Sequence, residues 1–243
     1  MTGAGSGIGR TVALLLAARQ PVAVVDVDPG RLAETAGLVR EQGGRCVAVP
    51  SDVRDVAACE RAVEEALVLG PLTDLVCAAG TIRGDGPLTE TTAEVWHDLL
   101  AVNLVGTANV VRAALPAMMA SGGGDVVLVS SIGAVRGRRW TSAYAASKAG
   151  VLGLATSLVA DYADRGIRTN CVCPGATATP MVARPGRPDV PELNAAGRLA
   201  TPAEVANVIV WLTEEASDWV VGAVVPADGG ETAVAAGTFN WAS

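Results

Sequence analysis

Short apolar segments alternate with longer segments of helical periodicity along almost the whole chain. The short segments are rich in Val and apolar throughout, which predicts buried parallel strands at 22–26, 46–49, 75–77, 126–129, 169–173 and 223–225. Between them, apolar residues recur at amphipathic spacing, which predicts helices near 8–18, 30–42, 55–69, 92–119, 142–165 and 202–215. This alternation predicts an α/β fold, a Rossmann-like doubly wound parallel sheet with helices on both faces.

The chain has 243 residues, a length that suits one α/β domain, and it shows neither an internal repeat nor a linker-like composition. We therefore expect residues 1–243 to form a single domain. The segment at about 176–200 is rich in Pro, Gly and Ala and has no clear period. Such a long irregular segment in a compact domain is either a lid over a functional site or a disordered loop, and we expect a lid.

Composition and charge exclude several classes of function. The net charge is −7 and there is no run of lysines or arginines, which disfavours nucleic acid and anionic membranes as partners. There is neither a signal-like N-terminus nor an uninterrupted apolar stretch of about 18 residues, so we expect a cytoplasmic protein. Five cysteines without a C-x-x-C pair indicate reduced thiols. The lone His97, expected to be structural or on the surface, excludes a multi-histidine metal site, and we expect no metal.

A glycine-rich turn, TGAGSGIG, occupies residues 2–9. Gly3 and Gly7 would let the backbone approach a pyrophosphate, whose charge would lie at the N-terminus of a helix that begins near Ile8. The spacing differs from the G-x-G-x-x-G dinucleotide fingerprint, and an ordinary glycine loop has the same composition.

Asp26 ends the next apolar strand, where a carboxylate can accept hydrogen bonds from both ribose hydroxyls of an adenosine. A strand-terminal Asp can instead cap the following turn. A 2′-phosphate beside Asp26 would be repelled, and neither Ser6 nor Val27 offers a cation to offset that repulsion. The pattern therefore favours NAD over NADP.

Tyr144 and Lys148 stand one helical turn apart, so an ammonium would lie near a phenol. That arrangement lowers the pKa of a tyrosine from about 10 and makes it a general base. A surface Tyr with a solvated Lys is the alternative.

Ser131 follows an apolar strand and would face the ligand crevice or cap a turn. Asn103 lies within a long apolar helix, where its amide could be catalytic or could satisfy a buried backbone group.

Taken together, the motifs resemble one family. The glycine turn, Asp26, Asn103 and Ser131 are followed by Tyr144-x-x-x-Lys148, and the order also includes Asp52-Val53, Ser130, Asn170-x-Val172-x-Pro174-Gly175 and Asp228-Gly229-Gly230. Over essentially its whole length the chain is similar to the short-chain dehydrogenases/reductases (SDRs) of the classical type.

The resemblance implies a role for each matching residue. Tyr144 would be the acid/base, Lys148 would lower its pKa and hold the nicotinamide ribose, Ser131 would bind the substrate oxygen, and Asn103 would anchor a relay water. The residues that would surround NAD are Gly3, Gly7, Ile8, Asp26, Asp52, Val53, Ala79, Gly80, Tyr144, Lys148, Pro174, Gly175 and Thr179. The family's sheet has seven parallel strands, and its members are commonly homotetramers or homodimers joined through the helices that would here be 92–119 and 142–165.

Two departures from the family pattern are evident. Cys77-Ala78-Ala79-Gly80 stands where the family has Asn-Asn-Ala-Gly, so amide contacts between neighbouring turns are lost. The strand that should precede the glycine turn, between strands 22–26 and 75–77, is missing from the sequence. We expect the natural chain to carry roughly five to ten further apolar residues upstream of Thr2, or the C-terminal segment 232–243 to cover the gap.

The predicted function is an NAD-dependent oxidoreductase that interconverts a secondary alcohol and a ketone, with oxidation as its working direction. Alternatives are a 3-oxoacyl-thioester reductase, a cyclic dihydrodiol-acid dehydrogenase and a non-catalytic dinucleotide-binding protein. Arg136, Arg138, Arg139 and Trp140 fall between Ser131 and Tyr144, at the expected substrate rim. Guanidinium groups there could attract an acidic substrate or form a solvated turn.

Overall fold

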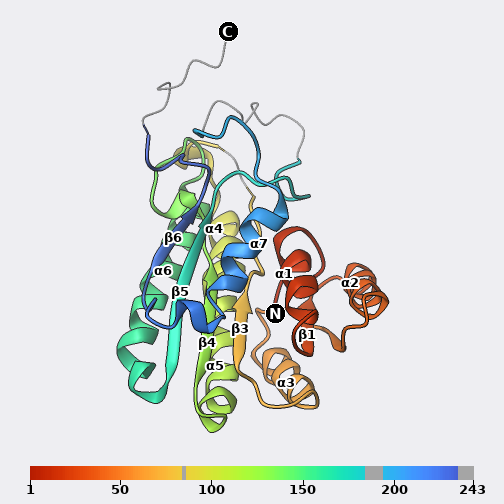
Figure 1. Cartoon of the computed structure of the whole chain (residues 1–243). Helices are drawn as coiled ribbons and strands as arrows, with labels where there is room; N and C mark the ends of the chain where they lie inside the picture. Colours follow the sequence, from red (N-terminus) through yellow and green to blue (C-terminus); the bar gives the residue numbers. More distant parts are fainter. Residues whose placement is uncertain (84–85, 184–193, 235–243) are drawn as a thin grey trace.

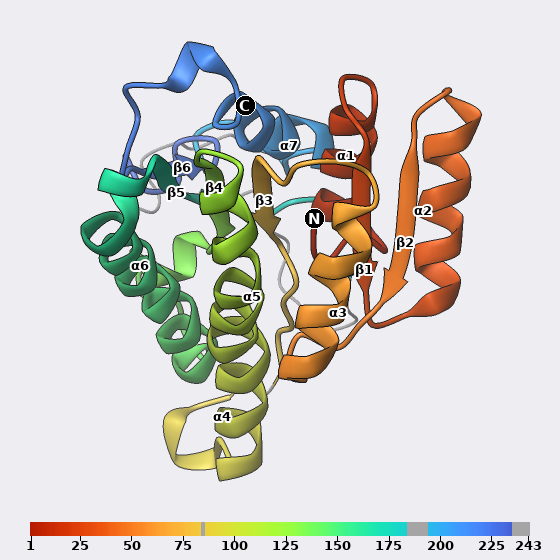
Figure 2. The same ribbon diagram turned by 90° about the horizontal axis from the view of Figure 1, so that it is seen from below.

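The computed structural model describes residues 1–83, 86–183 and 194–234. The strands run parallel in two blocks, β1–β2 and β3–β4–β5–β6 (Figures 1 and 2). Their bounds are β1 (Val22–Asp26), β2 (Cys46–Pro50), β3 (Asp74–Cys77), β4 (Gly124–Val129), β5 (Ile167–Pro174) and β6 (Val224–Ala227). The fold is a Rossmann-like doubly wound α/β sheet, as the alternation of segments predicts.

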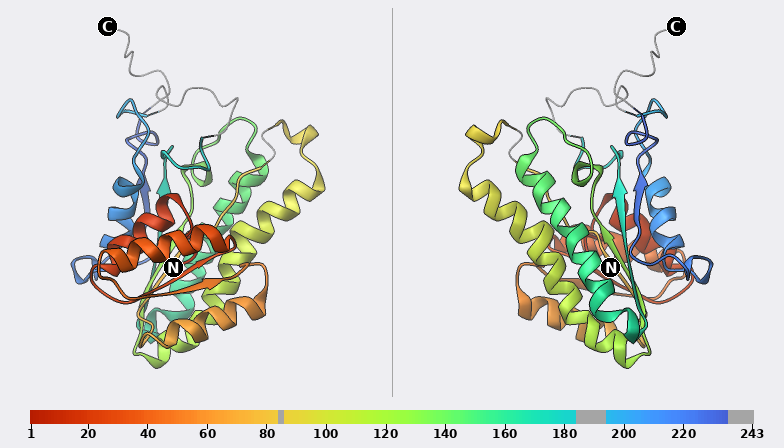
Figure 3. Two further views of the ribbon diagram at one scale, coloured as in Figure 1. Left: turned by 90° about the vertical axis from the view of Figure 1, so that its right-hand side faces the viewer. Right: turned by 90° about the vertical axis from the view of Figure 1, so that its left-hand side faces the viewer.

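Helices cover both faces of the sheet (Figures 2 and 3). One face carries α3 (Val56–Leu67), α5 (Gly106–Ala120) and α6 (Ser142–Tyr162), and the other carries α1 (Gly7–Ala17), α2 (Pro29–Glu41) and α7 (Pro202–Trp211). The remaining helical segments are α4 (Ala93–Leu100), η1 (Leu88–Glu90), η2 (Ala101–Val105), η3 (Ile132–Ala134), η4 (Ala163–Arg165) and η6 (Glu215–Ser217).

The strand pleat divides the core into two layers. Along β4, Val127 and Val129 pack with α1 and α7, whereas Val126 and Leu128 pack with α5 and α6. Successive side chains of a strand point to opposite faces, so a strand covered by helices on both sides must be apolar at every position. This explains the uninterrupted apolar segments.

Local sequence signals set the ends of several helices. Asp28 caps α2 by accepting hydrogen bonds from the backbone N–H groups of Gly30 and Arg31, with Pro29 in the first turn. Thr201 and Glu204 form a reciprocal capping box at the start of α7. Side chains that satisfy the first free N–H groups make a helix begin at a defined residue.

All the predicted strands and helices are present, with ends shifted by a few residues. The predicted helix 92–119 contains an interruption, because residues Ala101–Val105 form a π-helical turn between α4 and α5. π-Turns inside α-helices are often found at functional sites, and this one carries Asn103.

The first residues of the chain join the two blocks of strands. Thr2 forms parallel bridges to Val25 of β1 and Cys77 of β3. The Met1 ammonium donates to the Ala23 carbonyl at 3.0 Å, and burial lowers its pKa. Beyond Met1, between β1 and β3, lies a cavity of about 220 Å³. The glycine turn therefore starts between β1 and β3, where the sequence places the missing strand. The expectation of further upstream residues remains a prediction.

Two helical stretches, Ala93–Ala120 and Ser142–Arg165, are long and apolar enough to cross a membrane by length and composition alone. Both contribute to the core on one face of the sheet, through side chains such as Leu115 and Leu158. Burial against the sheet accounts for part of their apolar character, since the core helix of a globular domain meets the same criterion.

Candidate active site

A cavity of about 1630 Å³ opens at the carboxyl ends of the strands. Ligands of open parallel sheets bind at this edge, because the loops that follow the strands converge there. The predicted residues that line it are Gly3, Gly7, Ile8, Asp26, Asp52, Val53, Ala79, Gly80, Ser131, Tyr144, Lys148, Pro174, Gly175 and Thr179.

The glycine turn leads directly into α1 and depends on the absence of side chains. Gly3 has φ +68°, and a Cβ there would lie 2.6 Å from the carbonyl carbon of Ala78. A Cβ on Gly9 would lie 2.0 Å from the Gly3 carbonyl oxygen. Only glycine permits such close backbone approach, and it brings the N-terminus of α1 to the cavity, where free N–H groups favour an anion.

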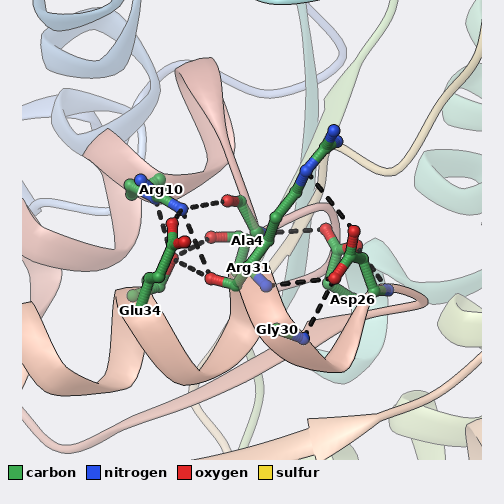
Figure 4. A network of polar contacts seen from close by, with 9 residues as sticks. Ala4, Arg10, Asp26, Gly30, Arg31 and Glu34 are labelled. Atoms are coloured by element: carbon green, nitrogen blue, oxygen red, sulfur yellow. Dashed lines mark hydrogen bonds and ion pairs between the residues drawn. The ribbon is translucent and has the colours of Figure 1, made fainter.

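Asp26 lies at the end of β1 with its carboxylate held by two backbone N–H groups (Figure 4). Gly5 donates to Oδ2 at 2.8 Å and Asp28 donates to Oδ1 at 3.0 Å. Each oxygen retains acceptor capacity, and the residue lines the cavity. The geometry therefore fits an acceptor for the two hydroxyls of a ribose, and it ties the glycine turn to β1.

A second network, which the motifs do not indicate, braces the glycine turn from behind (Figure 4). Arg10 donates to the Gly5 carbonyl at 2.6 Å and pairs with Glu34 of α2 at 2.8 Å. Thr35 donates to the Ala4 carbonyl at 2.8 Å. These contacts cross between α1 and α2, so only the folded chain reveals them.

Ser131 and Tyr144 lie beside each other across Gly133. A Cβ on Gly133 would lie 3.5 Å from Ser131 Oγ and 3.6 Å from the Tyr144 ring. Ser131 also caps η3, since its Oγ accepts a hydrogen bond of 3.1 Å from the Gly133 N–H. Both sequence-based readings of Ser131 therefore apply, because the residue that caps the turn also lines the cavity.

Lys148 is buried, and its Nζ donates to the Val129 carbonyl at 2.9 Å. Burial disfavours the ammonium and lowers the pKa of Lys148 to about 8. A Cβ on Gly80 would lie 3.2 Å from this Nζ, so glycine leaves open the space above the amine. The alternative reading, in which Lys148 is solvated, is therefore excluded.

Asn103 is fully buried and does not line the cavity. Its Oδ1 accepts from the Thr81 N–H at 2.8 Å, and its Nδ2 donates to the Thr81 carbonyl and to Ser147 Oγ, both at 3.0 Å. The side chain thus joins the loop after β3 to helix α6, one residue from Lys148. This bonding corresponds to the reading in which the amide satisfies buried groups, and the relay-water role remains a prediction.

Thr2 contacts the backbone of Cys77-Ala78-Ala79-Gly80, the segment in which the family's two Asn side chains are absent. Its carbonyl accepts from the Ala78 N–H and its Oγ1 accepts from the Ala79 N–H, each at 3.3 Å. The neighbouring turns are therefore still tied together.

The predicted lid, 176–200, has its central part, 184–193, outside the described residues. Its two flanks pair with each other, since Ala178 donates to the Ala200 carbonyl at 2.8 Å and Ala200 donates to the Ala176 carbonyl at 3.0 Å. Thr179 reaches the glycine turn, where a Cβ on Gly7 would lie 2.9 Å from its methyl group. The start of this segment therefore closes one side of the cavity.

Among residues 1–83, 86–183 and 194–234, no cluster of three His, Cys, Asp or Glu side chains is arranged to hold a metal ion. His97 is exposed on α4. The parallel sheet, the glycine turn before α1 and the acidic end of β1 define the class of protein, a Rossmann-like dinucleotide-binding fold.

Comparisons with known proteins place the chain within that class. A family model described as enoyl-(acyl carrier protein) reductase matches residues 3–232. The chain is 42% identical, over 96% of both chains, to cis-4-hydroxycyclohexanecarboxylate dehydrogenase of Sinomonas cyclohexanicum. It is 36% identical, over 95% of this chain and 94% of the relative, to (3R)-3-hydroxyacyl-CoA dehydrogenase of Rattus norvegicus. Carveol dehydrogenase from Mycobacterium avium, solved in complex with NAD, superimposes with a TM-score of 0.93 at 29% identity over 96% of each chain. The chain belongs to the short-chain dehydrogenase/reductase family.

Proposed function

We propose that the protein is an NAD-dependent dehydrogenase that oxidises secondary alcohols to ketones. The observation that carries this proposal is that Ser131, Tyr144 and buried Lys148 line the same cavity as the glycine turn and Asp26. A substrate oxygen and a dinucleotide can thus share one cavity.

Tyr144 is the acid/base in this proposal. Oxidation breaks the C–H and O–H bonds of the carbinol, and the proton passes to the Tyr144 oxygen as the C=O bond forms. Ser131 donates a hydrogen bond to the substrate oxygen and holds it beside the tyrosine. Lys148, an ammonium below pH 8, favours the phenolate electrostatically. NAD, when bound, supplies the acceptor of the hydride.

The residues around the adenosine end support NAD as the cofactor. The Asp26 carboxylate would accept from the ribose hydroxyls and repel a 2′-phosphate. Arg31, which also lines the cavity, lies 3.4 Å from Asp28, whose charge offsets its own. The Mycobacterium avium carveol dehydrogenase was solved in complex with NAD, which agrees with this assignment. Because cellular NAD is mostly oxidised, we assign oxidation as the working direction.

The relatives support two substrate classes. The Sinomonas relative is named for an alicyclic hydroxy acid and has the higher identity, so we place alicyclic secondary alcohols first. The rat relative is named for a hydroxyacyl thioester, which keeps the thioester alternative open as a second candidate. The non-catalytic alternative is disfavoured, since Ser131, Tyr144 and Lys148 all line the cavity.

Several coarser features belong to the same proposal. We assign residues 1–243 to one domain with a lid formed by about 176–200, a cytoplasmic location, and a homotetramer or homodimer built through α4–α5 and α6. The outer faces of these apolar helices remain available for a second copy, because the sheet covers only one side of each.

A screen of NAD reduction tests the proposal. Cyclohexanol, 4-hydroxycyclohexanecarboxylate and 3-hydroxybutyryl-CoA are each supplied with NAD or NADP, and NADH or NADPH is followed by absorbance. We expect the cyclic alcohols with NAD to be oxidised fastest. Preference for the thioester would favour the second candidate, and the absence of any reduction with the whole panel would refute the dehydrogenase assignment.

A further inference from the structure

The loop between η3 and α6 forms the part of the cavity wall nearest to Ser131 and Tyr144. Its four large side chains all line the cavity: Arg136, Arg138, Arg139 and Trp140. Three arginines on one short loop form a local positive charge in a protein whose net charge is −7. Whether they act on a substrate depends on which of them already have partners within the protein.

The cations along the rest of the cavity wall are mostly neutralised by neighbouring carboxylates. The ion pairs are Arg31 with Asp28 at 3.4 Å, Arg54 with Asp52 at 2.6 Å and Arg83 with Asp98 at 2.9 Å. Paired cations have little free charge to offer an anionic ligand. Among the described residues of the cavity wall, the unpaired arginines therefore lie on the loop beside Tyr144.

On that loop two of the three arginines are engaged. Arg136 donates to the backbone carbonyl of Glu231, and the Arg139 guanidinium stacks over the Trp140 ring, 5.2 Å from its centre. Arg138 is half-buried, and its guanidinium makes no hydrogen bond or ion pair with residues 1–83, 86–183 or 194–234. Arg139 likewise has no hydrogen-bond partner in the described part of the chain, but it is exposed, so Arg138 is the half-buried cation of this loop whose N–H groups are left for a ligand.

Glu231 provides an independent observation at the same place. Its side chain lines the cavity and is 2% exposed, yet its Oε2 has no hydrogen-bond partner among the residues that the structure describes. Burial raises the pKa of Glu231, an effect that Arg138 and Arg136 oppose and Asp228 reinforces. Buried carboxyl oxygens are normally paired, so the unpartnered Oε2 marks a desolvated polar site in which an arginine–ligand contact would be strong. A carboxylate ligand would be repelled by ionised Glu231 and is accommodated when Glu231 takes up a proton, which its raised pKa favours.

The backbone that carries Arg138 is held in place. Thr141 Oγ1 donates to the Arg138 carbonyl at 3.0 Å, and the Gly86 N–H donates to the Trp140 carbonyl at 3.2 Å. Trp140 adopts a left-handed conformation with φ +64°, which is costly for a bulky residue. Strain of this kind is retained where surrounding contacts impose it, typically beside functional sites. Arg138 is thus presented to the cavity by a preorganised loop.

We propose that Arg138 binds a carboxylate on the substrate, so that the substrate class is secondary alcohols that also carry a carboxylate, oxidised at the carbinol carbon. The planar guanidinium presents paired N–H donors that match the two oxygens of a carboxylate. This inference rests on the proposed function, because the carboxylate is held while Tyr144 accepts the proton from the hydroxyl group.

The test compares an acid with its neutral counterpart. The value of kcat/KM for NAD reduction is measured with 4-hydroxycyclohexanecarboxylate and with its methyl ester, in the unmodified protein, in Arg138→Gln and in Arg139→Gln. The unmodified protein should prefer the acid. Arg138→Gln should lower the acid-to-ester ratio of kcat/KM by about 10- to 100-fold, the size of a charge-assisted hydrogen bond. Arg139→Gln should leave the ratio nearly unchanged, since that guanidinium stacks on Trp140.

A binding measurement separates the effect from catalysis. Cyclohexanecarboxylate has no hydroxyl group to oxidise and should inhibit competitively against the acid substrate, with an inhibition constant that rises by the same factor in Arg138→Gln. The Tm of each variant verifies that the fold is retained. A loss of kcat/KM that is equal for acid and ester would show that Arg138 is structural and would overturn the proposal.

The remaining outcomes are also decisive. Oxidation of the ester without any preference for the acid would overturn the role of Arg138 and leave the proposed dehydrogenase function standing. If Arg138→Gln spares the acid but lowers kcat/KM with 3-hydroxybutyryl-CoA, the bound anion is a phosphate of the thioester carrier, and the carboxylate assignment is wrong. Failure of every alcohol to reduce NAD would refute the proposed function and this inference with it.

Discussion

Lys148 of α6 donates a hydrogen bond of 2.9 Å to the carbonyl oxygen of Val129, the last residue of β4. Ser130, the next residue, donates back to the Lys148 carbonyl at 2.8 Å. This reciprocal pair fixes the helix against the end of the strand. Because Tyr144 lies one turn before Lys148 and Ser131 follows Ser130, the same pair sets the spacing of the proposed catalytic groups.

Replacing Tyr144 tests the acid/base role. Tyr144→Phe should lower kcat by about 10²-fold or more, because no group then accepts the hydroxyl proton, while the Kd for NAD stays nearly unchanged. Tyr162→Phe is a matched control, since Tyr162 is the other tyrosine of the chain and lies at the far end of α6. Steady-state kinetics and NAD titration measure both. Wild-type turnover in Tyr144→Phe would show that another residue moves the proton.

Lys148→Met should harm two properties at once. It removes the charge that favours phenolate and the donor expected to hold the nicotinamide ribose, so kcat should fall by about 10-fold or more and NAD binding should weaken. Charge-assisted hydrogen bonds of this kind are worth about 1.5 to 3 kcal/mol. Calorimetric titration with NAD distinguishes this variant from Tyr144→Phe. An unaltered Kd would exclude the contact with the cofactor.

The lowered pKa of Lys148 predicts a pH dependence of stability. The folded protein releases this proton near pH 8, whereas the unfolded chain holds it to about pH 10.5. Between these values the unfolded state binds more protons at Lys148, so the contribution of this residue to the free energy of unfolding rises with pH, by on the order of 3 kcal/mol in total. Buried thiols with raised pKa values, such as Cys77, act in the opposite direction in both proteins. The free energy of unfolding of the wild type minus that of Lys148→Met, measured by denaturant unfolding from pH 7 to 10.5, should therefore show the rise. Parallel curves would contradict the assignment.

Asp26→Ala should weaken NAD binding by about 10- to 100-fold and reduce the preference for NAD over NADP, because it removes both the ribose acceptor and the repulsion of a 2′-phosphate. Asp164→Asn is the control, since it removes an exposed carboxylate of η4 that does not line the cavity. Kd values for both cofactors provide the measurement. An NADP preference in the wild-type protein would show that Arg31 outweighs Asp26.

The cavity beside Met1 predicts that an added strand would stabilise the protein. An extension of five apolar residues before Met1 can pair with β1 and β3, fill the 220 Å³ cavity and move the charged N-terminus out of the sheet. We expect Tm to rise by at least about 5 °C. An extension of five Gly and Ser residues is the control, and an equal rise with it would attribute the gain to relocation of the charge alone.

The order of strands and helices follows from the sequence because it depends on local periodicity. Buried parallel strands must be apolar on both faces, and helices must place an apolar stripe on the sheet, so both leave a pattern within one segment. The motifs were equally readable, since the glycine turn and Tyr144-x-x-x-Lys148 are defined by short spacings. The residues that these motifs predict for the cofactor site all line one cavity in the structure.

The roles of Asn103, Thr2 and Glu231 were not readable in the same way. Asn103 lies in a π-turn and bonds to Thr81 and Ser147. Thr2 bridges β1 and β3, which begin at residues 22 and 74. Glu231 lies beside the arginines of a loop almost a hundred residues earlier in the chain. Each contact joins distant segments, and a residue type alone does not specify its distant partner. The sequence by itself determined the fold class and the family and supplied the candidate reacting groups, because these arise from local pattern and short motifs. Only the tertiary structure decided which buried amide, carboxyl and guanidinium groups meet, because such pairing depends on how the whole chain packs.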